Sequence, residues 1–139
     1  MFNFLTGDGA MIQLILYIHD EADEAGQCMQ NGIDQRFQAF PRLICPDLET
    51  LKQNLKRPVR YGDLNIFILL ADTRDRLEDL HQLHEYFDDK KLLLILPDDE
   101  KSTYASGFRL YPRFVTLKSD FEIYLYEVLE KMIEYHNRK

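Results

Sequence analysis

Acidic side chains and one lysine follow the apolar runs of this sequence, at the points where the runs end. His19-Asp20-Glu21 follows the first run, Asp72-Thr73 the third, Pro97-Asp98-Asp99 the fourth and Lys118-Ser119 the fifth. Carboxylate oxygens can hold a divalent cation, an aspartate can act as a nucleophile, and a lysine ammonium can pair with an anion. These groups can share one pocket if the runs are parallel strands that end at the same edge of a sheet.

Five short apolar runs predict the strands that would position these groups. Several are continuously apolar rather than alternating, which is typical of parallel strands covered on both faces. Their starts, near residues 12, 42, 65, 92 and 113, leave room for one helix in each interval. We therefore expect a single α/β domain over residues 1–139, with a doubly wound, five-stranded parallel sheet in the order 2-1-3-4-5. The runs are Met11–Ile18, Arg42–Cys45, Asn65–Ala71, Leu92–Leu96 and Arg113–Leu117.

Apolar residues three and four positions apart predict helices between the first three runs. A first helix falls within residues 22–40, although Gly26 and Gly32 each weaken it by about 1 kcal/mol relative to alanine. A second helix is entered through Asp47 and is stopped by Pro58.

The same spacing predicts the later helices. The third has Asp75 in the position of a cap and Glu78 in the position of its partner three residues on. The fourth connection, residues 98–112, fits a short or broken helix. The last helix begins at Ser119 or Asp120 and is expected to cover the sheet.

Over its whole length the chain resembles the receiver domains of bacterial response regulators. Asp20 and Glu21 resemble the acidic pair of that family, Asp72 its phosphoryl-accepting aspartate, and Lys118 its lysine after the fifth strand. The resemblance implies a flavodoxin-like fold. It also implies Mg²⁺ held by Asp20, Glu21 and Asp72, transfer of a phosphoryl group to Asp72 with Lys118 against its oxygens, and a histidine kinase as partner.

The chain departs from the receiver pattern at several positions. Receivers carry Ser or Thr after the fourth strand, whereas this sequence has Pro97 followed by acidic residues. The loop after Asp72 is short, Ser119 replaces a proline, and Thr116 occupies the expected aromatic position. These departures favour a degenerate or pseudo-receiver, a non-catalytic signal-transduction module that acts through protein–protein contacts and needs no cofactor. The alternative is an active receiver that accepts a phosphoryl group on Asp72 with Mg²⁺.

Each candidate site residue also has an ordinary structural explanation. Asp20 and Glu21 can begin the first helix, where negative charge is favoured by about 0.3–1 kcal/mol. Asp72 can cap the third helix, which contributes about 1 kcal/mol, and Lys118 can be a solvated loop cation. Neither a glycine-rich phosphate-binding motif nor a Gly-x-Ser-x-Gly motif occurs, so the sequence does not predict a Rossmann enzyme or a hydrolase.

The last helix is predicted to form a contact surface for a protein partner or for a second copy. Besides its core-facing residues it carries a second, partly apolar stripe of Ile123, Tyr126 and Ile133. Tyr124 and Tyr135 add amphipathic aromatic rings of the kind enriched at interfaces. In receivers the fourth and fifth helices and the fifth strand commonly form a dimer face, so the resemblance implies the same surface. The alternative is that Ile123 and Ile133 pack under the fourth connection.

Composition excludes several other classes of partner. Seventeen basic residues against twenty-four acidic ones give a net charge of −7, which disfavours nucleic acid and anionic membranes. The longest apolar run, Ile66–Ala71, is far shorter than the roughly 20 residues of a membrane span. The first nine residues carry no positive charge, unlike a secretory signal, so the expected compartment is the cytoplasm. Cys28 and Cys45 are expected to be small buried apolar residues.

Overall fold

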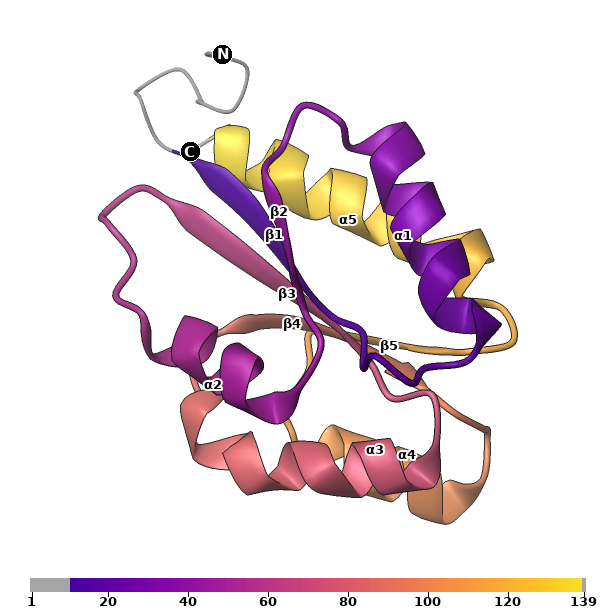
Figure 1. The fold of residues 1–139 in the computed structure, drawn as a ribbon. Helices are drawn as coiled ribbons and strands as arrows, with labels where there is room; N and C mark the ends of the chain where they lie inside the picture. The colour runs from indigo at the N-terminus through magenta and orange to yellow at the C-terminus, as the bar shows by residue number, and fades with distance from the viewer. Residues whose placement is uncertain (1–10, 139) are drawn as a thin grey trace.

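The computed structural model describes residues 11–138 and contains a five-stranded sheet with helices on both faces (Figure 1). All strands are parallel and lie in the order β2-β1-β3-β4-β5. The fold class and strand order predicted from the sequence are therefore confirmed, and the fold is a flavodoxin-like α/β fold. The strands are β1 (Ile12–Tyr17), β2 (Arg42–Cys45), β3 (Leu64–Leu70), β4 (Lys91–Leu96) and β5 (Phe114–Leu117).

The helices lie in two layers, with α1 and α5 on one face of the sheet and α2, α3 and α4 on the other (Figure 1). The helix α3 continues directly into a 3₁₀ helix, η2 (His81–Tyr86). No helix within residues 11–138 is long and apolar enough to cross a membrane. The α-helices are α1 (Glu24–Arg36), α2 (Leu48–Lys56), α3 (Arg74–Leu80), α4 (Lys101–Phe108) and α5 (Phe121–Asn137).

Two hydrophobic cores, one on each face, explain why the strands are continuously apolar. Along β3, Ile66, Ile68 and Leu70 pack into the core beneath α1 and α5. The alternate residues Phe67 and Leu69 pack into the core on the face of α2, α3 and α4. Side chains of a strand alternate between its two faces, so a strand with both faces buried needs apolar residues at every position.

Side chains of the connecting loops set the starts of three described helices. Asp23 caps α1 by accepting from the Ala25 N–H, and Asp47 caps α2 by accepting from the Thr50 N–H. Thr73 caps α3, because its hydroxyl accepts from the Arg76 N–H at 3.1 Å. The prediction that Asp75 is this cap is therefore wrong, and Asp75 lies in the first turn of the helix.

Candidate functional site

The crevice at the carboxyl ends of the strands is centred on β1 and β3. These two strands are adjacent, but the connection after β1 leads to α1 on one face and the connection after β3 leads to α3 on the other. This divergence opens the edge of the sheet where ligands of such folds bind. The residues that follow the strands can therefore be compared directly with the site predicted from the sequence.

Lys118 joins three parts of this edge. It directly follows β5, and its backbone N–H donates to the Leu96 carbonyl at the end of β4. Its Nζ donates to Asp23 Oδ2 at 2.7 Å and to the backbone carbonyl oxygen of Asp72 at 3.0 Å. Asp72 and Lys118 are thus neighbours, as predicted, but their contact is through the main chain of Asp72 and not through its carboxylate.

Asp23 is the carboxylate that pairs with Lys118, and it was not among the residues predicted for the site. The residue has two tasks, because one carboxylate oxygen accepts from the Ala25 N–H and the other accepts from Lys118. The hydrogen bond from Lys118 is the main reason why the pKa of Asp23 lies below its ordinary value. An aspartate immediately before a helix is a common cap, so a search for the start of the first helix could have found it.

The carboxylate of Asp72 is buried and faces a different cation. The residue is only 3 % exposed, and its Oδ1 lies 3.3 Å from Nε of Arg76, four positions along the chain. This pair has the separation of a salt bridge without the angle of a hydrogen bond. The nearby Tyr17 hydroxyl is also buried, and burial raises its pKa to about 12. Asp72 therefore lies among buried polar groups, with its charge balanced by Arg76.

Asp20 and Glu21 are exposed residues of the connection between β1 and α1. The Asp20 side chain is 72 % exposed, and the Asp20 N–H donates to the Pro46 carbonyl after β2. His19 Nδ1 accepts from the Glu21 N–H at 3.0 Å, so the same nitrogen does not donate to Asp20. The structure does not bring Asp20, Glu21 and Asp72 together as metal ligands, and residues 11–138 contain no cluster of three His, Cys, Asp or Glu side chains suited to a metal.

The loops after β3 and β4 are tied together by a second cation. Arg74 Nε lies 2.8 Å from Asp98 Oδ2, and Arg74 Nη2 lies 3.0 Å from Glu100 Oε1. The hydrogen bond from Arg74 is the main reason why the pKa of Asp98 falls to about 2. The acidic residues after β4 are therefore partly neutralised by the first residue of α3.

A hollow of about 340 Å³ opens beside Lys118, between the starts of α1 and α5. Asp23 and Pro97 line it together with Phe121 and Cys28. The prediction that Cys28 is buried is wrong, because the thiol lies on the exposed side of α1. Cys45 is buried at the end of β2 as predicted, and burial raises its pKa to about 11.

The predicted contact stripe on α5 is not a surface stripe. Tyr126 is 3 % exposed and Ile133 is 6 % exposed, and both belong to the core beneath α1 and α5. The Tyr126 ring lies near the Phe37 ring after α1 and has the Arg36 guanidinium 4.8 Å from its centre. The stripe is covered because α5 packs against both the sheet and α1. Two faces of α5 are therefore buried.

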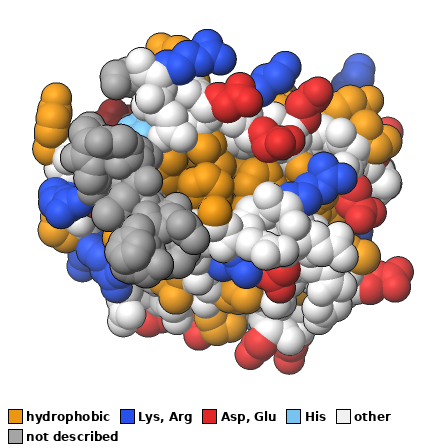
Figure 2. Space-filling model, turned by 90° about the horizontal axis from the view of Figure 1, so that it is seen from above, with side chains coloured by type: hydrophobic (Ala, Val, Ile, Leu, Met, Phe, Trp, Pro, Cys, Tyr) orange, Lys and Arg blue, Asp and Glu red, His pale blue; other side chains and the backbone are white. Residues whose placement is uncertain are grey.

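Ile123 is the member of the stripe that stays on the surface, and it is 66 % exposed. Figure 2 views the molecule over the layer of α1 and α5, where hydrophobic side chains gather in the middle of the face and charged side chains border them. Tyr124 and Tyr135 are also exposed on α5.

No protein-family model, curated protein or solved structure matches this chain. Any function must therefore be inferred from the geometry of the site. The site contains two ion pairs at the carboxyl edge of the sheet. Lys118 pairs with Asp23, and the buried Asp72 pairs with Arg76.

Proposed function

We propose that the chain is a receiver-like signal-transduction module of the cytoplasm that is not phosphorylated and that acts through protein–protein contacts. The observation that carries this proposal is the position of the Asp72 carboxylate. An aspartate that accepts a phosphoryl group must present an oxygen to the incoming phosphorus atom. The Asp72 carboxylate is instead almost fully buried, with Arg76 beside it.

The surroundings of Asp72 support the same proposal. Charge on a transferred phosphoryl group has to be neutralised by cations that are available to it. Lys118 is held by Asp23, and Arg74 is held by Asp98 and Glu100, so these two cations already have carboxylate partners. Pro97 leaves the position after β4 without a hydroxyl. Three separate features of the site therefore oppose phosphoryl transfer.

The contact surface that we propose lies beside the edge strand β5. Phe108 at the end of α4 is 56 % exposed and stacks on Tyr104, and Tyr111 is 81 % exposed. Tyr111 has a φ of 56°, a left-handed conformation that is uncommon for a bulky residue. Exposed aromatic rings beside the open edge of a sheet are suited to contact with another protein. A second copy of the chain or another signalling protein can fill this role.

The experiment that tests the absence of phosphorylation is intact-mass spectrometry after incubation with Mg²⁺ and a small phosphodonor such as acetyl phosphate. We expect the mass of the protein to stay unchanged. An adduct of one phosphoryl group that requires Mg²⁺ and is absent from Asp72→Asn would support the alternative, an active receiver that a histidine kinase phosphorylates.

The proposed contact surface has its own test. Phe108→Ser should weaken self-association, measured by sedimentation over a range of concentrations, or binding to a partner encoded with this chain. Val59→Ser, which removes an exposed apolar side chain between α2 and β3, is the control. Equal effects of the two substitutions, or none from Phe108→Ser, would exclude the surface beside β5.

A further inference from the structure

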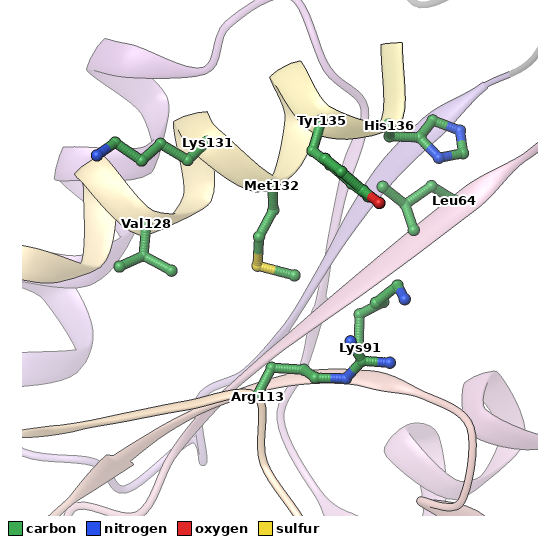
Figure 3. A pocket seen from close by; sticks show the side chains of 8 residues that line it. All are labelled: Leu64, Lys91, Arg113, Val128, Lys131, Met132, Tyr135 and His136. Carbon is green, nitrogen blue, oxygen red and sulfur yellow. The ribbon is translucent and has the colours of Figure 1, made fainter. Parts of the chain in front are cut away.

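A second cavity lies at the opposite edge of the sheet, where the strands begin. Its volume is about 400 Å³, within the roughly 300–1,000 Å³ range of small-molecule sites. One wall is the C-terminal half of α5, and the other is the start of β3, β4 and β5 (Figure 3). Figure 3 labels the 8 residues that line it.

The apolar part of the cavity is a stripe of α5 that the core covers only in part. Val128, Met132 and Tyr135 are four and three positions apart, so they share one face of the helix. Figure 3 shows Met132 and Tyr135 pointing toward the strands. Val128 and Met132 are only partly buried against the core, so a ligand on this stripe would cover more of their apolar surface.

The charged part of the cavity is a pair of cations at the strand starts. Lys91 begins the row that continues with Leu93 and Ile95, whose side chains pack into the core under α5. Lys91 therefore lies on the α5 side of β4, where the row is otherwise apolar. The backbone N–H of Arg113 donates to the Leu92 carbonyl at 2.8 Å, and the Arg113 side chain lines the same cavity as Lys91 (Figure 3).

The end of the cavity is fixed by a hydrogen bond between distant parts of the chain. His136 Nε2 lies 2.9 Å from the carbonyl oxygen of Gly62, before β3. A carbonyl only accepts, so Nε2 carries the proton of this bond. The bond holds the last turn of α5 over the strand starts.

We infer that this cavity binds a small organic monocarboxylate with an apolar body. The lining contains cations and no acidic residue, although the chain as a whole carries a net charge of −7. Local positive charge is thus concentrated where an anion could enter, and charge-assisted bonds from a guanidinium to a carboxylate are strong and directional. Lys91 and Tyr135 each have other interactions. Figure 3 shows the side chain of Lys131 extending away from the strand starts, so Arg113 is assigned as the anion contact.

The test uses the full chain labelled with ¹³C in its methionine methyl groups and titrated with octanoate. The Met132 methyl signal should shift saturably, whereas the Met29 signal should not move, because Met29 is fully buried in the core. Arg113→Gln should weaken octanoate binding about tenfold or more, the effect of removing a hydrogen bond to a charged group. Arg109→Gln, which removes an exposed arginine of the opposite layer, should have no effect.

Octan-1-ol separates anion recognition from simple hydrophobic contact. It should bind more weakly than octanoate, and Arg113→Gln should not change its affinity. The inference is wrong if Met132 does not respond to octanoate, if octan-1-ol binds as tightly, or if both arginine variants lose affinity equally. A Met132 signal that moves with protein concentration alone would assign the cavity to a second copy of the chain and would also overturn it.

Discussion

Lys118 Nζ donates to Asp23 Oδ2 at 2.7 Å, across 95 positions of the sequence. The bond joins the loop after β5 to the cap of α1, and the same ammonium also holds the main chain at Asp72. The lysine thus ties three connections together at the carboxyl edge of the sheet. The Lys118 ammonium therefore has two oxygen partners within the chain, which supports the proposal that the site is not phosphorylated.

Removing the Asp23 carboxylate should destabilise the protein more than removing an ordinary cap. We expect Asp23→Ala to lower the free energy of unfolding by about 1–2 kcal/mol, since it loses both the cap and the bond from Lys118. Asp47→Ala, which loses a cap without a lysine, should cost about 1 kcal/mol. Urea denaturation measures both. A double-mutant cycle of Asp23→Ala with Lys118→Met should give a coupling of about 0.5 kcal/mol, and additive effects would show that the two residues do not interact.

The partnership of Asp72 with Arg76 predicts a structural role for the aspartate. Asp72→Asn should lower the free energy of unfolding by about 2 kcal/mol or more, because it leaves the partly buried Arg76 without its anion. Asp75→Asn, on the same helix but in its exposed first turn, should change stability by no more than about 0.5 kcal/mol. Thermal and urea unfolding are the measurements. Equal small effects for both variants would mean that Asp72 is not part of the packed structure.

Gly32 should not tolerate a side chain, although it lies inside a helix. An alanine normally favours a helix interior by about 1 kcal/mol over glycine. At Gly32 a Cβ atom would overlap the Tyr126 hydroxyl and ring, so we expect Gly32→Ala to destabilise by about 1–3 kcal/mol. Tyr126→Leu in the same chain should remove most of that penalty. A stabilising Gly32→Ala would contradict the packing of α1 on α5.

The ion pair between Arg74 and Asp98 should lower the pKa that is measured for the Asp98 carboxyl group. The pKa of Asp98 is lowered from 3.8 to about 2, mainly by the hydrogen bond from Arg74. A carboxyl group whose pKa is lowered on folding stabilises the folded state at pH values above 3.8. That contribution is lost as the pH falls toward 2. Carboxyl ¹³C NMR should give a midpoint near 2 for Asp98 and a higher one in Arg74→Gln. Arg109→Gln should leave the midpoint unchanged.

The fold was predictable because its signals are local and strong. Continuous apolar runs such as Ile66–Leu70 occur where both faces of a strand are covered, and the intervals between them set the crossover helices. The order 2-1-3-4-5 is one of the common arrangements of such repeats, and the structure has it. The closeness of Asp72 and Lys118 was predictable because both residues follow strands that end at the same edge of the sheet.

The details of the site were less predictable because they depend on tertiary packing. Any of several acidic residues after β1 could reach Lys118, and Asp23 does so because the cap of α1 places it there. The spacing of Tyr126 assigned it to a second, exposed stripe of α5. It is buried because Gly32 of α1 leaves room for its ring, a relation between two helices that no single stripe reveals.

The central claim is that the Asp72 carboxylate cannot accept a phosphoryl group, and beryllofluoride tests this directly. This anion binds to an accessible acceptor aspartate as a mimic of the acyl phosphate, and ¹⁹F NMR distinguishes bound from free fluoride. With Mg²⁺ present, we predict no protein-bound ¹⁹F resonance from the wild-type chain. A bound resonance that requires Mg²⁺ and disappears in Asp72→Asn would contradict the account.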